Sequence, residues 1–222
     1  MRQLIRHIAT DFNPMHPTPA FHYDDRGEAL AFISAYPFAT LAVNGKQGPV
    51  TALVPLVIDN DGLTLLGHVA RMNRFWEAAR QGGGQAVAIF CGADAYVSPS
   101  FYPSKQEHGK AVPTWNYVAV EIRGEITIET QAEAMMPYIT ALTDKMESHR
   151  EGPWQVSDAP DDYIAKLSRG IVGFRLSIED VTHVKKVSQN KSEADKQGVV
   201  QSLANSQNMS ERAMAMEMTK TH

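Results

Sequence analysis

Short apolar segments separated by turn-forming residues dominate the chain between residues 38 and 70. Residues 38–43 and 50–58 are rich in valine, leucine and threonine, and residues 44–48 between them tolerate positive φ angles, which favours a hairpin. A second turn at residues 59–62 leads into another apolar segment at residues 63–69. Three strands joined by tight turns predict an antiparallel meander.

The same pattern predicts more strands further along the chain. They are expected at residues 86–90, 115–122, 171–178 and 181–187, with residues 124–128 continuing the sheet after 115–122, for a total of roughly seven strands. Residues 92–113 are polar and are expected to form a long loop. Because loops of this length are uncommon unless they have a function, this segment is a candidate binding region.

Apolar residues at helical spacing predict helices between the strands. These helices are expected at residues 26–36, 72–81, 132–147 and 160–168, and a loosely held helix is expected in the polar tail from Ser202 onward. Runs of strands with helices inserted at the turns favour a mainly β, antiparallel barrel over a doubly wound parallel sheet. We expect an N-terminal extension at residues 1–14, one domain over residues 15–200 and a C-terminal helical tail over residues 201–222.

Composition is typical of a globular protein of 222 residues, with 43% hydrophobic and 21% charged residues. The single cysteine, Cys91, lies in an apolar run and is expected to be a small buried hydrophobe. No apolar stretch is long enough to span a membrane and no secretory signal pattern is evident, so a cytoplasmic location is expected. The net charge of −4 weakens a nucleic-acid role without excluding a local basic patch.

Several catalytic and nucleotide-binding motifs are missing from the sequence. There is no Gly-x-Gly-x-x-Gly after a strand, no Gly-x-x-x-x-Gly-Lys, no His-Glu-x-x-His and no Gly-x-Ser-x-Gly. Rossmann dehydrogenases, nucleotide hydrolases, zinc proteases and α/β-hydrolases are therefore disfavoured.

The segment from Gly67 to Asn73 is the first candidate site, because a strand there hands over to a helix. Such a junction exposes backbone N–H groups and the positive end of a helix dipole, and the planar fork of Arg71 suits phosphate. The alternative is equally open: Arg71 is solvated or paired with a carboxylate, and His68 is a satisfied residue at a strand end.

The segment from Tyr96 to Lys105 combines three aromatic residues, several hydroxyls and a lysine with two prolines that stiffen it. Such a loop suits a planar heterocyclic ligand, although its aromatics can equally fold back on the barrel. His108 can titrate near neutral pH. Further on, Trp115 and Tyr117 should share one side of a strand and Asn116 the other. One of these sides can line a pocket, but a tryptophan and a tyrosine two positions apart are more often core.

The segment from Ser188 to Asp195 offers amides, hydroxyls and a lysine that could bind a polar ring edge or a phosphate. It can also be an ordinary helix cap. The sequence holds one small basic cluster in this region, formed by Lys185, Lys186, Lys191 and Lys196, although lysines at a strand end are usually solvated.

Four segments in one order, at residues 66–73, 95–105, 112–120 and 187–195, together resemble the PaiB-like family of FMN-binding negative transcriptional regulators. The resemblance extends from about Met15 to the end of the chain. It implies an antiparallel, Greek-key-like split β-barrel of the pyridoxamine-phosphate-oxidase type, which forms a homodimer and binds FMN at the subunit interface. The sequence departs from the family pattern at residues 181–187, which lack a tryptophan, and at Phe101, where a Trp-Tyr pair is usual.

The resemblance also implies which residues contact FMN. Arg71 and its neighbours would hold the phosphate, and the strand at residues 51–55 would run beside the isoalloxazine ring. The full set expected at the cofactor is Thr51, Leu53, His68, Ala70, Arg71, Asn73, Tyr96, Ser98, Lys105, Trp115, Asn116, Gln189, Asn190 and Lys191. No metal is expected.

Two functions follow from the resemblance. The first is a flavin-binding repressor. No helix-turn-helix or basic recognition helix is evident, so DNA remains a possible partner that no motif supports, and repression can also be indirect. The second is an FMN-dependent oxidoreductase, for which Tyr102, Lys105 and His108 are the residues to test. A third possibility is a haem-binding barrel with His68 and His108 as axial ligands.

Overall fold

An eight-stranded sheet, in which every strand pair is antiparallel, organises the computed structural model, which describes residues 15–16 and 18–220. The order is β2-β1-β5-β6-β7-β4-β3, and β8 pairs with β6 outside this path. The strands are β1 (Phe38–Gly45), β2 (Gly48–Pro55), β3 (Val57–Ile58), β4 (Thr64–Ala70), β5 (Gln85–Val97), β6 (Thr114–Glu129), β7 (Ile171–Ser177) and β8 (Asp180–Lys186). The predicted antiparallel sheet and its first hairpin are confirmed.

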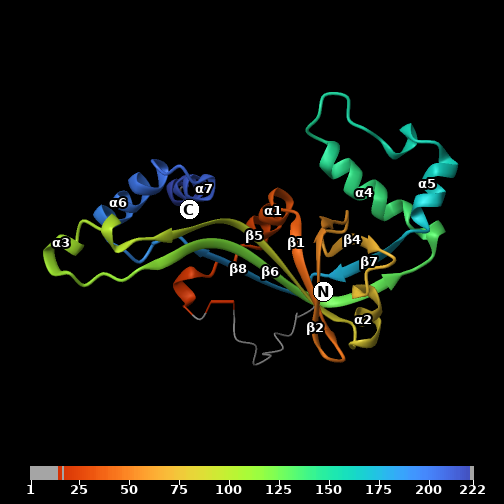
Figure 1. The fold of residues 1–222 in the computed structure, drawn as a ribbon, viewed down its shortest axis with the longest axis horizontal. Coiled ribbons are helices and arrows are strands. Elements are labelled where there is room, and N and C mark those ends of the chain that lie inside the picture. The colour runs from red at the N-terminus through yellow and green to blue at the C-terminus, as the bar shows by residue number, and fades with distance from the viewer. Residues whose placement is uncertain (1–14, 17, 221–222) are drawn as a thin grey trace, which may run out of the picture.

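Two of the strands are much longer than the sequence pattern predicts. β5 continues past Gly92 to Val97 after a bulge between Cys91 and Asp94, and β6 joins the two predicted strands into one of 16 residues. The prediction of a loop over residues 92–113 is therefore wrong in its first part. The long strands leave the barrel as a curved arm, on which β8 also pairs with β6 (Figure 1).

The apolar segment at residues 50–58 forms two strands, which corrects the single strand predicted there. β2 pairs with β1 up to Pro55, whereas Val57 and Ile58 pair with β4. Between them, the Leu56 N–H donates to the Pro37 carbonyl at 2.9 Å. The chain therefore changes its pairing partner from β1 to β4 at this point.

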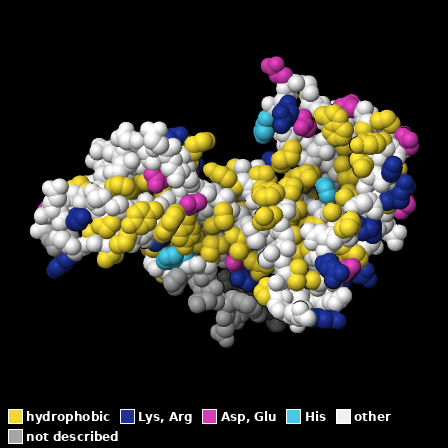
Figure 2. Space-filling model, viewed as in Figure 1, with side chains coloured by type: hydrophobic (Ala, Val, Ile, Leu, Met, Phe, Trp, Pro, Cys, Tyr) yellow, Lys and Arg dark blue, Asp and Glu magenta, His cyan; other side chains and the backbone are white. Residues whose placement is uncertain are grey.

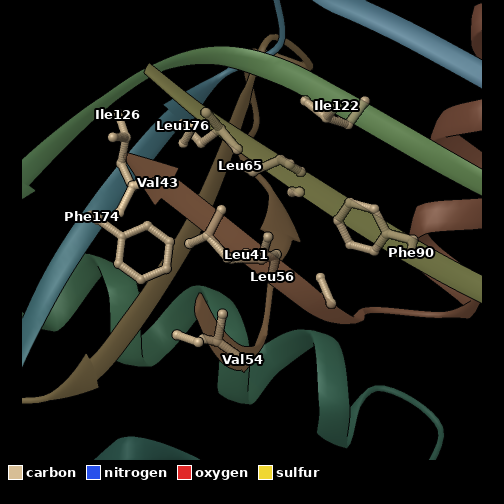
Figure 3. Close-up of a cluster of buried hydrophobic side chains, with 14 of the residues drawn as sticks. Leu41, Val43, Val54, Leu56, Leu65, Phe90, Ile122, Ile126, Phe174 and Leu176 are labelled. Atoms are coloured by element: carbon tan, nitrogen blue, oxygen red, sulfur yellow. The ribbon is translucent and has the colours of Figure 1, made fainter. Parts of the chain in front are cut away.

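The barrel core is formed by side chains that point inward from the paired strands (Figure 3). Leu41, Leu65, Phe90 and Phe174 are fully buried within it. Gly67 lies so close to this core that a Cβ would fall 2.6 Å from both the Leu56 side chain and the Phe174 ring. A glycine is therefore required here by packing.

Helices cover the ends of the barrel and one side of the arm (Figure 1). The glycines after α2 mark the end of that helix as expected, whereas the helix predicted over residues 132–147 begins only at Met136, with Pro137 in its first turn. The α-helices are α1 (Arg26–Ala35), α2 (Phe75–Gln81), α3 (Lys105–His108), α4 (Met136–Glu147), α5 (Asp161–Ser168), α6 (Glu193–Ala204) and α7 (Met209–Thr219). Short 3₁₀ turns are η1 (Pro19–Phe21), η2 (Pro99–Phe101), η3 (Ala132–Ala134) and η4 (Val156–Asp158).

A second core lies between the arm and the two C-terminal helices. Leu203 of α6 and Met214 of α7 are fully buried there, together with Val97 of β5. The helix predicted in the tail is present, but it is not loosely held, because α7 packs its apolar face on β5. Phe32 of α1 packs against both cores.

The cysteine is not buried as the sequence suggested. Cys91 is exposed on β5, because the outer face of the sheet is open to solvent at this strand. Within residues 15–16 and 18–220, no helix is long and apolar enough to cross a membrane. The N-terminal extension expected at residues 1–14 lies outside the described residues.

Candidate functional site

The turn between β4 and α2 is fastened to the barrel by the Arg71 side chain. The Arg71 Nε–H donates to the Arg169 carbonyl at 2.8 Å, and Nη2 donates to the carbonyls of Thr130 at 2.8 Å and Ile171 at 3.0 Å. Three of the five guanidinium N–H groups are thus used by the backbone. Within the described residues Nη1 has no partner, so its two N–H groups are available to an anion.

The start of α2 is already capped by its own chain. The Asn73 Oδ1 accepts a hydrogen bond from the Phe75 N–H at 3.0 Å, and the Trp76 indole N–H donates to the Arg71 carbonyl at 2.9 Å. The helix has only seven residues. The free helix end expected from the sequence is therefore partly occupied, and Asn73 serves the helix itself.

His68 and Ala70 precede this turn on β4. Ala70 is exposed, whereas His68 is half-buried and its Nδ1 has no hydrogen-bond partner among the described residues. Burial lowers the pKa of His68 below its ordinary value of 6.5, so the imidazole stays neutral at physiological pH.

The outer face of the sheet carries four of the expected residues. Leu53 lies opposite Thr40, Thr40 lies opposite Ile89, and directly opposed residues point to the same face. Following this register through β5 and β6 places Tyr96 and Trp115 on that face too. Thr51 is exposed there, two positions before Leu53 on the same strand.

This face is apolar and open. Leu53 is 69% exposed, Trp115 is 54% exposed and Tyr96 is 44% exposed. The Tyr96 and Trp115 rings meet edge to face with centroids 6.1 Å apart. Trp115 is therefore not a core residue, whereas the predicted opposite orientation of Asn116 is confirmed by its 1% exposure.

A small pocket of about 160 Å³ lies where β6 begins and β8 ends. It brings together three of the expected residues, Asn116, Asn190 and Lys191. Its other lining residues are Val112, Pro113, Thr114, Lys186 and Ser188. Lys186 belongs to the basic cluster of the sequence and Ser188 begins the segment at residues 188–195, but neither was predicted to line a pocket.

The floor of the pocket is a buried pair of polar side chains. The Asn116 Nδ2 donates to the Ser188 Oγ at 2.9 Å, and the Ser188 Oγ lies 3.2 Å from the Asn116 Oδ1. Ser188 has a φ of 62°, a left-handed conformation that is uncommon outside glycine. This turn of the backbone leads directly into the pocket residues Asn190 and Lys191.

Gln189 holds this turn rather than facing a ligand. Its Oε1 accepts from the Val187 N–H at 2.8 Å, and its Nε2 donates to the carbonyls of Lys185 at 2.6 Å and Ala20 at 3.2 Å. The amide is thereby used within the fold, and it ties the N-terminal segment to the end of β8.

The loop after β5 is anchored to α6. Tyr102 is only 3% exposed, and burial together with the Asp195 carboxylate raises the pKa of its hydroxyl. Ser104 donates to Asp195 through both its N–H and its hydroxyl. Ser98 caps η2 by accepting from the Ser100 N–H at 3.2 Å. Tyr102 thus folds back as in the alternative interpretation, and Lys105 stays exposed at the start of α3.

The two histidines considered as axial haem ligands are far apart. His68 lies on β4 in the barrel, whereas α3, which contains His108, lies at the far end of the arm (Figure 1). The two segments that contain these histidines therefore lie apart in the fold. Across residues 15–16 and 18–220, no group of three or more histidine, cysteine, aspartate or glutamate residues is arranged to hold a metal ion.

A further groove, which sequence analysis missed, lies between the β1–β2 hairpin and α2. Its volume is about 460 Å³, and Lys46, Arg74, Glu77 and Gln81 contribute polar groups to it. The hairpin and helix are distant in sequence, so only the folded chain brings these residues together.

Comparisons with known proteins agree with this architecture. A family model described as "Putative FMN-binding domain" matches residues 15–180. "Protease synthase and sporulation protein PAI 2" of Bacillus subtilis (strain 168) is 28% identical over 197 residues, which cover 88% of this chain and 92% of that protein.

Solved structures share the fold at low sequence identity. The FAD and heme binding protein from Mycobacterium smegmatis has a TM-score of 0.57 at 16% identity, with 78% of each chain covered. The flavocytochrome Anf3 from Azotobacter vinelandii has a TM-score of 0.56 at 12% identity, covering 79% of this chain and 74% of that chain. The split-barrel fold expected from the sequence is confirmed.

Proposed function

This chain belongs to the family of FMN-binding domains, so FMN is its cofactor, and from that premise we propose that it is a homodimeric, FMN-binding negative regulator of gene expression. The observation that carries the proposal is the open outer face of the sheet. Leu53, Tyr96 and Trp115 leave this face apolar and solvent-exposed, although most of the opposite face is buried.

The residues on this chain fit FMN. The cofactor has an anionic phosphate and a flat apolar ring, and the chain offers the free Nη1 of Arg71 for the first and the outer face for the second. Thr51 and Leu53 would border the ring. When bound, FMN supplies reversible electron transfer, and the protein supplies position and shielding.

A second copy of the chain is the proposed cover of the outer face. Exposed apolar patches on soluble domains mark interaction sites, and a two-fold dimer uses the same patch on both copies. Hydrophobic side chains also run along the arm towards the barrel (Figure 2). In this arrangement FMN lies between the two copies, where water is excluded from its ring.

The regulatory role is proposed to be indirect. The name of the Bacillus subtilis relative refers to protease synthase and sporulation, which supports a role in controlling such programmes. A net charge of −4 disfavours direct binding of the chain to DNA. The proposed signal is therefore the flavin, read by a protein partner.

An FMN-dependent oxidoreductase is the second candidate. The observation that favours it is the same exposed platform, because a flavin held there needs few protein groups to exchange electrons with a small substrate. Of the residues expected to serve it, Tyr102 is buried, whereas Lys105 is exposed.

Adding FMN to the purified protein tests the proposal through its visible absorbance and its sedimentation. We expect bound flavin, a dimer, and a Cys91 thiol protected from maleimide, because Cys91 lies on the proposed interface. Leu53→Asp should release monomers with a reactive thiol, whereas the matched change Leu167→Asp on α5 should not.

The outcomes separate the parts of the proposal. A protein that stays colourless would contradict FMN binding, and a monomer with a reactive Cys91 would contradict the proposed dimer interface. Flavin-dependent consumption of NAD(P)H would favour the oxidoreductase over the regulator.

A further inference from the structure

The pocket between the start of β6 and the end of β8 has the chemistry of an anion site, and it is separate from both the Arg71 turn and the open outer face. We propose that this pocket binds a phosphate-class oxyanion, held by Lys186 and Lys191 with the amide of Asn190, above the floor that Asn116 and Ser188 form. This inference does not depend on FMN being bound.

Charge is the first argument. Two lysines line the pocket, and none of its lining residues carries a carboxylate. The Lys186 Nζ donates to the Thr114 hydroxyl at 2.7 Å, and the Lys191 Nζ lies 5.1 Å from the centre of the Tyr102 ring. Neither of these partners neutralises an ammonium group.

Neighbouring lysines show the contrast. The Lys185 Nζ lies 2.6 Å from a Glu28 carboxylate oxygen, and the Lys196 Nζ lies 3.4 Å from Glu193. The basic cluster of the sequence is thus split by the fold, since two lysines are paired with carboxylates and two line one pocket. In a chain with a net charge of −4, a pocket whose charged side chains are all positive is unusual.

The Asp195 carboxylate, which interacts with Lys191, is already engaged. Asp195 is buried beside Lys191, and the burial that would raise its pKa is outweighed by hydrogen bonds from Ser104 and Ser192, so its pKa is lowered. Its carboxylate is therefore occupied by the loop and by the cap of α6. It does not line the pocket.

The lysines repel each other in this setting. The pKa of Lys186 is lowered, mainly by burial and to a smaller extent by the Lys191 ammonium. An oxyanion between the two ammonium groups would offset this repulsion and raise that pKa again. The ordered floor favours binding too, since Asn116 and Ser188 hold each other in place before any ligand arrives.

Size selects the class of ligand. Pockets for drug-sized molecules start at about 300 Å³, whereas this pocket holds about 160 Å³. A tetrahedral oxyanion fits such a volume, and a whole flavin does not. The phosphate can belong to a free phosphorylated compound or to the tail of FMN, and the two sources need separate arms in the experiment.

The direct test is calorimetric titration of the full chain with inorganic phosphate. Lys186→Met and Lys191→Met should each weaken binding by about tenfold or more, as expected when a charged hydrogen bond is lost. Lys166→Met, which removes an exposed lysine from α5, should leave binding unchanged. Asn190→Ala, at the exposed rim, provides a variant that leaves the buried floor intact.

A second arm identifies the source of the phosphate. If FMN supplies it, inorganic phosphate will compete with FMN but not with riboflavin, and the lysine variants will weaken FMN alone. If a separate compound supplies it, FMN affinity will be the same in wild type and variants. Either pattern supports the oxyanion site.

Two results would overturn the inference. One is a wild-type protein that releases no heat with phosphate and shows no change in thermal stability with it. The other is equal phosphate affinity in wild type, Lys186→Met and Lys191→Met, which would place the bound anion elsewhere. Neither result would bear on FMN binding or on the dimer, because no flavin is present in this arm.

Discussion

The β4–α2 turn and the β8–α6 turn look alike in sequence, since each follows a strand and each carries a basic side chain beside amides or hydroxyls. In the fold they differ. Arg71 donates three N–H groups to the carbonyls of Thr130, Arg169 and Ile171. Lys186 and Lys191 instead line a pocket that contains no carboxylate.

The difference shows that the availability of a cation depends on the backbone around it. Arg71 stands next to the ends of β6 and β7, where carbonyl groups lack ladder partners, so its guanidinium satisfies them. Around Lys186 the neighbouring backbone is already paired in the sheet. We therefore expect removal of the Arg71 side chain to lower stability, and removal of the Lys186 or Lys191 side chain to affect mainly phosphate binding.

Arg71→Ala should have the largest effect on stability. Three carbonyls lose a charged donor, which should lower the free energy of unfolding by about 3 kcal/mol in urea denaturation. Its exposed neighbour provides the control, because Arg74→Ala should change stability by less than about 0.5 kcal/mol. Equal midpoints for the two variants would contradict the fastening role of Arg71.

The second turn should respond to backbone conformation. Ser188→Ala should cost about 2 kcal/mol, since Asn116 loses its buried partner, and Ser188→Gly should be about 1 kcal/mol more stable than the alanine variant. The reason is the φ of 62°, which glycine adopts freely. At Ser148, where φ is −54°, the order should reverse. The same order at both sites would argue against strain at Ser188.

Phosphate should stabilise the protein through the pocket at the second turn, and not through Arg71. At a phosphate concentration about ten times the dissociation constant, mass action adds about 1.4 kcal/mol, or about 3–6 °C in Tm. Lys186→Met should lose this shift in a thermal melt, while Arg71→Lys should keep it. A shift that survives in Lys186→Met would locate the stabilising anion outside the pocket.

The smallest effect should be a pH dependence at the first turn. Burial lowers the pKa of His68, so the unfolded chain binds the proton more readily than the folded chain. Stability should therefore fall as the pH drops below about 6.5, and His68→Leu should flatten this slope. His149→Leu, at an exposed position, should not. Parallel pH profiles for wild type and His68→Leu would remove His68 as the cause.

The elements that depend on local chemistry were predictable. The turn-forming residues Asn44–Gly48 predicted the first hairpin. The apolar spacing within α1 and the proline at position 37 predicted that helix and its end. Strand lengths were not predictable, because the extension of β5 to Val97 depends on pairing with β6. That partner lies about twenty residues away along the chain and leaves no trace in the pattern of β5 itself.

The candidate site was predictable in residue type but not in geometry. The segment at residues 188–195 supplied Asn190 and Lys191 to the pocket, yet the role of Gln189 as a clasp depends on the distant Ala20 carbonyl. Arg71 likewise meets carbonyls sixty to one hundred residues away. Trp115 is exposed because no side chain of the described chain covers it fully, which its apolar character alone could not reveal.

Phe32 packs against both cores and so links the barrel to the arm, which matters for local unfolding of the two parts. The barrel and the arm share strands but have largely separate sets of buried side chains, so the arm can behave as its own cooperative unit in hydrogen exchange. The pocket lies on that unit. Its occupancy would then be recorded as slower exchange in α6 and α7, while the amides of the barrel keep their rates.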